Sequence, residues 1–172
     1  MNSVLFIFSG LPGSGKSVLA KEIAIRTKSV YSRIDTIEQG IRDLCNYNVQ
    51  GEGYRLSYRI AKENLMIGNS VVSDSCNPWK LTRQEWENVA IESNAQYINI
   101  EVKCSDKNEH KRRIETRKCE IEGLILPTWE EVEKRKIEVW SEEHIEIDTA
   151  NKTKDESINE LIDLLRKRDL GI

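Results

Sequence analysis

The sequence predicts one α/β domain, residues 1–172, built around a five-stranded and mainly parallel β-sheet. Two observations predict this fold class. Short apolar runs typical of buried strands alternate, over 172 residues, with longer stretches in which apolar residues recur every three or four positions. The first apolar run also ends in a glycine-rich loop, Gly10–Ser17, that leads directly into a helical pattern. Strands alternating with helices in this way form parallel sheets that carry helices on both faces.

Five segments have the character of strands. Ser3–Ser9 is a continuous apolar run, which indicates a strand buried on both faces. Two of the other segments are followed by an acidic residue, Asp35 in one case and Asp74 in the other. These other segments are Val30–Ile34, Ser70–Ser73, Gln96–Cys104 and His144–Ile147.

Helical periodicity fills the segments between these runs. Thr82 and Thr128 each have a Glu three residues later, the pattern of a capping box, so we expect them to begin helices. Ser105 or Asp106 is expected to begin a very polar helix that continues to about Lys118. The helical segments are 17–27, 37–44, 54–65, 82–93, 105–118, one that begins at 128, and 158–165.

Composition excludes several classes of protein. The 26 Lys and Arg residues against 29 Asp and Glu give a net charge of −3, which argues against a non-specific nucleic-acid binder but allows a local basic cleft. No apolar run is long enough for a transmembrane helix, and the short run Met1–Phe8 lacks the basic start of a signal peptide. The four cysteines are scattered, which is typical of reduced thiols. We therefore expect a cytoplasmic protein with no membrane partner.

The glycine-rich loop carries the strongest functional signal. It satisfies the pattern G-x-x-x-x-G-K-[ST] between a strand and a helix, which predicts a P-loop for the phosphates of a nucleoside triphosphate, taken to be ATP with Mg²⁺. Glycines allow the backbone N–H groups to turn inward, and the following helix points its positive end at the phosphates. Its binding residues are Gly10, Pro12, Gly13, Ser14, Gly15, Lys16 and Ser17.

Two positions in the loop have chemical roles of their own. Lys16 is expected to reach the β- and γ-phosphates and to take part in catalysis, and the Ser17 hydroxyl to bind Mg²⁺. We also expect Lys16 to be an exposed loop residue, so that its replacement changes stability by about 0.5 kcal/mol or less.

Two acidic residues follow strands at the edge where parallel sheets bind their ligands. Asp74 is predicted to support Mg²⁺, through a bound water, and its alternative role is a turn cap. Asp35 is predicted to orient a substrate hydroxyl and accept its proton, and its alternative role is a helix cap.

Other P-loop classes fit less well. GTP-binding switches carry DxxG and NKxD motifs, and here Asn151-Lys152 is followed by Thr153 and Lys154, with Asp155 one place too late. A chain of 172 residues has room for a nucleotide and one small acceptor under a lid. That is the plan of a small-molecule kinase.

The sequence resembles the P-loop kinases grouped with zeta toxin, chloramphenicol phosphotransferase, gluconate kinase, adenylylsulfate kinase and the kinase domain of polynucleotide kinase. The resemblance rests on GLPGSGKS, RIDTIEQGIR, VVSDSCNPW, VKCSDKNEHKRRIETR and IDTANKT. It implies a P-loop three-layer sandwich, similar to a bacterial group of single-domain ATP-binding kinases, in which Asp35 matches the usual base. Polynucleotide kinases also have an Arg shortly after that Asp, whereas the first one here is Arg42. Nucleic acid is therefore the less favoured acceptor.

The resemblance also implies a lid, which we place at residues 106–127. In similar kinases an Arg of the helix after the fourth strand reaches over the triphosphate. Arg113 and Arg117 are spaced i, i+4 and share a face, and Arg112 lies to one side, so we expect Arg113 to bind nucleotide and Arg117 to be catalytic. The alternative is a solvated charged face. In similar kinases the loop after the last strand packs on adenine, and Thr149 matches it.

Residues for the acceptor are less well defined. Arg42, Arg55 and Arg59 could meet an anionic acceptor or pair with nearby acids such as Glu38 on the surface. Trp79 and Trp86 could line a pocket or fill the core.

The sequence thus predicts an ATP- and Mg²⁺-dependent kinase that phosphorylates a hydroxyl of an unidentified small molecule. One alternative is a polynucleotide or nucleotide kinase. An alternative of another class is a nucleotide-binding regulatory ATPase, which would need no acceptor base at Asp35.

Overall fold

The computed structural model describes residues 3–168 of the chain. Within this range the fold is a five-stranded, all-parallel sheet with strand order β2-β3-β1-β4-β5, which confirms the predicted fold class. The strands are β1 (Val4–Ser9), β2 (Val30–Arg33), β3 (Val71–Asp74), β4 (Gln96–Lys103) and β5 (Ile145–Asp148). The helices are α1 (Lys16–Thr27), α2 (Ile34–Cys45), α3 (Glu52–Met66), α4 (Lys80–Glu92), α5 (Lys107–Thr116), α6 (Trp129–Glu133) and α7 (Lys154–Arg166).

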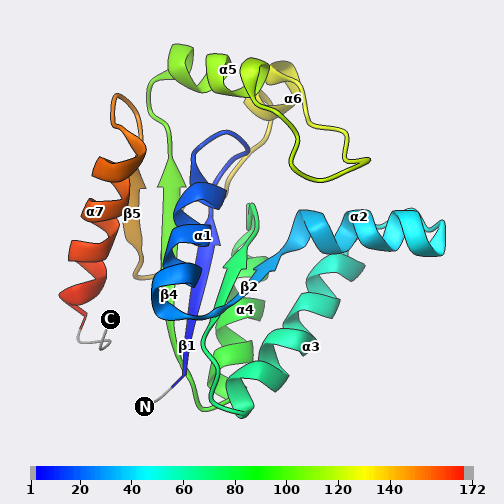
Figure 1. Ribbon diagram of the computed structural model, residues 1–172, viewed down its shortest axis with the longest axis vertical. Helices are drawn as coiled ribbons and strands as arrows, with labels where there is room; N and C mark the ends of the chain where they lie inside the picture. The colour runs from blue at the N-terminus through cyan, green and yellow to red at the C-terminus, as the bar shows by residue number, and fades with distance from the viewer. Residues whose placement is uncertain (1–2, 169–172) are drawn as a thin grey trace.

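Helices cover both faces of the sheet (Figure 1). On one face α1 and α7 pack on side chains such as Phe6, Phe8 and Ile100, and on the other α3 and α4 pack on Leu5 and Ile7. Because β1 alternates between the two cores and is buried along its whole length, its apolar run is continuous. The glycine-rich loop that follows β1 is therefore anchored at the centre of the sheet.

A separate layer stands over the carboxyl ends of the strands (Figure 1). It consists of α5, α6 and the loop between them, and Ile114, Trp129 and Val132 pack there around Leu11 of the glycine-rich loop. Asp106 caps α5, and Thr128 forms a capping box with Glu131 at α6, both as the sequence predicts.

Several predicted boundaries differ from those of the structure; for example, α7 begins at Lys154, four residues before the predicted segment 158–165. Pairing between β2 and β3 stops at Arg33 and Asp74, so β2 ends at Arg33, and Asp35 lies in the first turn of α2 instead of closing a strand. Helix α4 begins at Lys80, because the Thr82 hydroxyl donates back to the Trp79 carbonyl (2.8 Å) and does not cap. Helix α5 ends at Thr116, two residues early.

No helix within residues 3–168 combines the length and the apolar character that crossing a membrane requires.

Candidate functional site

The glycine-rich loop connects β1 to α1 at the carboxyl edge of the sheet. Gly10, Gly13 and Gly15 have φ values of 142°, 81° and 92°, a region that side chains rarely adopt. A Cβ on Gly10 would lie 2.1 Å from the Val102 carbonyl oxygen, so this loop also packs too closely on β4 for a larger residue. The sequence therefore dictates both the bend of the backbone and its approach to the sheet.

Lys16 is buried, contrary to the expectation of an exposed loop residue. Its side chain is 8% exposed and forms an ion pair with Asp74, whose side chain is 1% exposed. Burial opposes both charges, but their mutual attraction prevails, so the pKa of Lys16 is raised and the pKa of Asp74 is lowered. Tyr31 donates a further hydrogen bond to Asp74 (2.6 Å). Loss of Lys16 would thus leave a buried carboxylate with a diminished set of partners, and the expected 0.5 kcal/mol is too small.

Ser17 and Asp74 offer the oxygen ligands that suit Mg²⁺. Ser17 lies in the first turn of α1 and Asp74 is the last residue of β3, and the Ser17 hydroxyl forms a hydrogen bond that helps lower the pKa of Asp74. A hydroxyl beside an ionised, buried carboxylate fits a hard cation that retains several of its waters. The roles of both residues toward Mg²⁺ stay predictions.

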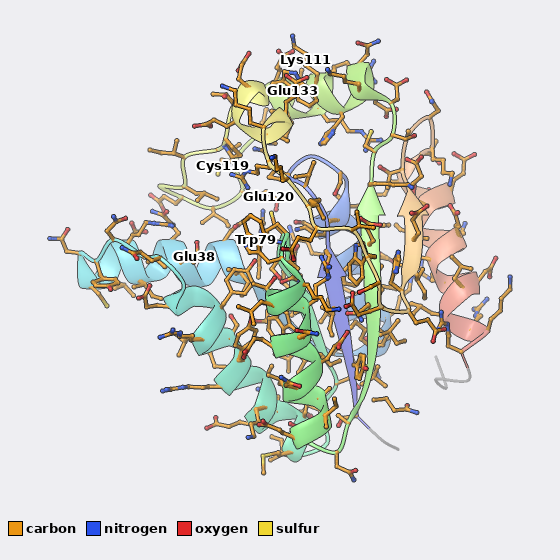
Figure 2. All side chains as sticks on the ribbon, turned by 180° about the vertical axis from the view of Figure 1, so that it is seen from behind. Glu38, Trp79, Lys111, Cys119, Glu120 and Glu133 are labelled. Atoms are coloured by element: carbon orange, nitrogen blue, oxygen red, sulfur yellow. The ribbon has the colours of Figure 1, made fainter. Side chains whose placement is uncertain are left out.

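A cavity of about 450 Å³ opens above the glycine-rich loop, and we call it the first cavity. Cys119 and Glu120, on the loop after α5, lie across from Glu38 on α2 around its open side (Figure 2). It brings together most of the residues that the sequence singles out. Those lining it are Pro12, Gly13, Gly15, Lys16, Ser17, Asp35, Arg113 and Arg117.

A second cavity of about 700 Å³ lies between α2, α3 and the start of α4. Tyr54, Tyr58 and Trp79 give it an aromatic wall. Four residues line both cavities: Asp35, Glu38, Cys76 and Arg135. The Asp35 side chain is 56% exposed, so its carboxylate is free to meet ligands from either side.

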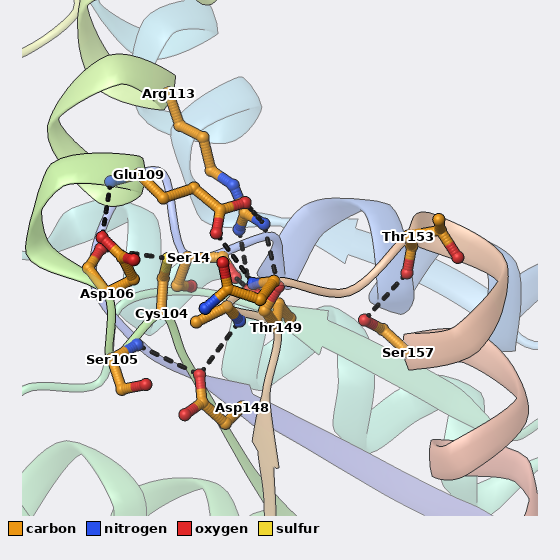
Figure 3. A network of polar contacts seen from close by, with 12 residues as sticks. Ser14, Cys104, Ser105, Asp106, Glu109, Arg113, Asp148, Thr149, Thr153 and Ser157 are labelled. Carbon is orange, nitrogen blue, oxygen red and sulfur yellow. Dashed lines mark hydrogen bonds and ion pairs between the residues drawn. The ribbon is translucent and has the colours of Figure 1, made fainter.

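Arg113 and Thr149 form one network that ties α5 to the loop after β5 (Figure 3). The Arg113 guanidinium donates to the Thr149 hydroxyl (2.7 Å) and carbonyl (2.9 Å) and pairs with Glu109. The Thr149 hydroxyl donates to the Ser14 carbonyl (2.8 Å) in the glycine-rich loop. The hydrogen bonds of Arg113 therefore connect α5, through Thr149, to the glycine-rich loop. The Arg113 side chain also borders the first cavity.

Arg117 lies just beyond the end of α5, at the edge of the first cavity. Its guanidinium donates to the Pro127 carbonyl (3.3 Å), and its buried Nε has no partner among residues 3–168. Burial lowers the pKa of Arg117, partly offset by the negative charge of Asp35. Arg112 is exposed and does not line this cavity.

The residues proposed for an acceptor separate into groups. Arg42 borders the first cavity and Arg55 the second, whereas Arg59 is exposed and borders neither. Trp79 is half exposed and lines the second cavity, but Trp86 is fully buried in the core beneath it.

Sequence reasoning missed several residues of the site. Arg33 lies 3.9 Å from Asp74 and 4.0 Å from Asp35, and so faces both carboxylates. His110 is buried, and its Nε2 forms a hydrogen bond with the Pro12 carbonyl oxygen (2.8 Å). Arg135 follows a short helix with no motif around it. Of these three residues, only Arg33 could have been found from the sequence, because it lies two residues before Asp35.

Comparisons with known proteins agree with this fold. The profile of the family described as "Chromatin associated protein KTI12" matches residues 4–165. The L-seryl-tRNA(Sec) kinase of Methanococcus maripaludis is 28% identical over 179 residues, which cover 98% of this chain and 69% of that protein. A Pyrococcus furiosus protein provisionally named an adenylate kinase is 28% identical over 177 residues, covering 98% and 89% of the two chains. The structure of Mycobacterium tuberculosis APS kinase in complex with AMPPNP and APS superposes with a TM-score of 0.68 at 17% identity, covering 96% of this chain and 98% of that one.

Proposed function

This chain belongs to the KTI12 family, and from that premise we propose that it is an ATP-dependent kinase that transfers the γ-phosphoryl group to a hydroxyl of a small acceptor. The observation that carries the proposal is the position of Asp35. Its carboxylate borders both the first cavity, which holds the glycine-rich loop, and the second cavity, which has the room and the aromatic wall to bind an acceptor.

In this proposal the first cavity binds the triphosphate. The loop N–H groups and Lys16 bind the phosphates, Ser17 binds Mg²⁺, and Asp74 supports the ion through a water. Thr149 does not line this cavity, and a contact between its loop and the adenine stays a prediction from the resemblance. Bound Mg²⁺ would supply charge neutralisation at the β- and γ-phosphates.

For the transfer, the acceptor hydroxyl must lie beside Asp35 and point at the γ-phosphorus. The acceptor oxygen forms a bond to phosphorus as the bond to the β-bridging oxygen breaks, and the acceptor proton passes to the Asp35 carboxylate. Arg117 is positioned at the same cavity to offset charge on the moving group. Little covalent chemistry falls to the protein, since positioning and electrostatics dominate this reaction.

The names of the relatives support a kinase without fixing its acceptor. One is named for the seryl group of a tRNA and another, provisionally, for an adenine nucleotide. A nucleotide acceptor is the second candidate, favoured by the aromatic side chains of Tyr54 and Trp79 in the second cavity. The finer resemblance to zeta toxin and chloramphenicol phosphotransferase, the single domain over 1–172, the lid at 106–127 and a cytoplasmic location stay predictions.

The experiment is a screen for ATP-dependent phosphorylation over metabolites, antibiotics, nucleotides and 5′-hydroxyl oligonucleotides. Wild-type protein is compared with Asp35→Asn, and with Asp43→Asn as a control on the same helix but outside both cavities. A kinase labels one acceptor class and loses labelling in Asp35→Asn alone. Slow ATP hydrolysis with no labelled acceptor, unchanged in Asp35→Asn, would instead favour a regulatory ATPase.

A further inference from the structure

Two acidic residues lie side by side on neighbouring strands, away from both cavities. Glu101 of β4 and Glu146 of β5 are direct partners in the parallel register. Like charges placed opposite one another in a sheet are destabilising unless something neutralises them. His144 joins them at the start of β5, and one ligand atom from each of the three residues lies within 4.8 Å of the other two.

The imidazole of His144 is held in a fixed orientation. Its Nδ1 lies 2.9 Å from the Glu142 carbonyl oxygen, so Nδ1 carries the hydrogen and donates it. The ring also stacks on Trp140, with centroids 4.5 Å apart. In the neutral ring, Nε2 is then left with its lone pair, facing Glu101 Oε2 at 3.6 Å, which is too long for a hydrogen bond. A metal-binding histidine is fixed by the same kind of bond from its other nitrogen.

Asn99 supplies an independent observation. It is 2% exposed, and its Nδ2 donates to Glu87 of α4 (2.6 Å), whereas its buried Oδ1 has no partner among residues 3–168. One step back along the register from the β4–β5 pairs, Asn99 lies opposite His144, and these two residues, but neither Glu101 nor Glu146, line one hollow of about 280 Å³. A buried carbonyl oxygen without a partner is costly, and a cation would satisfy it.

We propose that Glu101, His144 and Glu146, with Asn99 beside them, form a binding site for a divalent transition-metal ion of the zinc class. One imidazole nitrogen with carboxylate oxygens is a donor set that suits Zn²⁺. Lys103, which now pairs with Glu146 (2.7 Å), neutralises that carboxylate and gives way when the ion binds. None of these residues lines the first or second cavity, so the site is separate from the proposed kinase chemistry.

The ion would link the segment between α6 and β5 to strand β4. His144 is the residue before β5, whereas Glu101 lies within β4, two residues before its end. Coordination of one ion by both residues would fix the segment before β5 to the sheet. The expected consequence is a stability of the fold that increases with zinc concentration.

The test uses the full chain without nucleotide. Zinc is titrated by calorimetry, and Co²⁺ is used as a spectroscopic probe. We expect one ion per chain, a rise in melting temperature with Zn²⁺, and a Co²⁺ spectrum that lacks a thiolate charge-transfer band, since none of the proposed ligands is a cysteine. Glu101→Gln and His144→Gln should each weaken zinc binding by more than the roughly 10- to 100-fold that loss of an outer partner causes.

Matched controls keep the result specific. Glu143→Gln removes a nearby exposed carboxylate that pairs with Arg168 and should bind zinc as wild type does. Circular dichroism checks folding, and if His144→Gln is unfolded, Glu101→Gln, which keeps the side-chain shape, decides the matter. No saturable binding, binding that survives a folded Glu101→Gln variant, or a thiolate band would each overturn the proposal.

Discussion

The Lys16 ammonium group donates to the Asp74 carboxylate in an ion pair whose two side chains are 8% and 1% exposed. Lys16→Ala is therefore expected to lose most triphosphate affinity and also to destabilise the fold. Removing one partner of a buried pair costs about 3–5 kcal/mol. Because Tyr31 and Arg33 remain near Asp74, we expect the lower end of that range. Nucleotide titration and urea unfolding measure the two effects.

The double variant Lys16→Met with Asp74→Asn separates them. It removes both charges, so it should recover much of the lost stability while still failing to bind ATP. If Lys16→Ala binds ATP as tightly as wild type, the phosphate-binding role of the loop is wrong.

Asp35→Asn is expected to reduce phosphorylation of the acceptor by about 10²- to 10⁴-fold, the usual contribution of a general base. ATP affinity should change by no more than about a few-fold, because the residues proposed to bind the phosphates are those of the loop, including Lys16, and not Asp35. The amide keeps the shape of the side chain, and no helix cap is lost because Arg33, and not Asp35, is the N-cap of α2. A rate equal to that of wild type, once an acceptor is known, would show that Asp35 does not act as the base.

Residues 106–127 are expected to exchange amide hydrogens more slowly when an ATP analogue binds. The loop after Thr116 is mostly exposed and has few buried anchors, which places it among the less stable parts of the fold. Glu109→Gln should speed exchange in α5 without nucleotide, because Glu109 pairs with Arg113 and accepts from the Asn151 amide. Strand β1 serves as the internal reference. Equal protection of this segment with and without ligand contradicts its role as a lid.

Stability near the ion pair should depend on acid pH. The pKa of Asp74 in the folded protein is below its ordinary value of 3.8, so its contribution is present above that value and is lost as pH falls through the lower folded pKa. The difference in unfolding free energy between wild type and Asp74→Asn should be large at pH 7 and should shrink below about pH 4. Urea unfolding at a series of pH values measures it, and a difference that does not change with pH would show that the pKa of Asp74 is not lowered.

Two glycine substitutions should have opposite effects. Gly10→Ala places a Cβ 2.1 Å from a backbone oxygen at a φ of 142° and should be strongly destabilising. Gly40→Ala lies inside α2 with no atom within 4 Å of the new Cβ, and should stabilise by about 0.5–1 kcal/mol. Thermal unfolding of the pair tests this, and equal effects would contradict the close packing of the glycine-rich loop.

Sequence patterns predicted the fold well because its strongest signals are local. The continuous apolar run of β1, the glycine-rich loop and the cap at Thr128 each depend on residues that are neighbours in the chain. The same patterns misplaced Asp35, because the end of β2 is decided by where its pairing with β3 stops. They also missed the burial of Lys16, since its partner Asp74 lies 58 residues away.

The candidate site was harder to predict for the same reason. The side chain of Arg113 is directed by Thr149, 36 residues later, and a helical spacing contains no information about that contact. Arg135 borders both cavities only because α6 folds back over the sheet. The roles assigned to the individual site residues stay predictions.

Because Asp35 lies on a helix, residues far from the cavities could change the position of its carboxylate. In the proposed reaction the phosphates would be held by the glycine-rich loop that follows β1, whereas Asp35 belongs to α2, which is anchored by the buried Ile34 at its start and packs on α3 beyond it. The far end of α2 projects outward, where Leu44 is 88% exposed. Asp35 lies near the anchored end of α2, so a tilt of the exposed outer end would also move the Asp35 carboxylate. A partner or substitution that tilts the outer end would change the gap between base and phosphorus without touching either one.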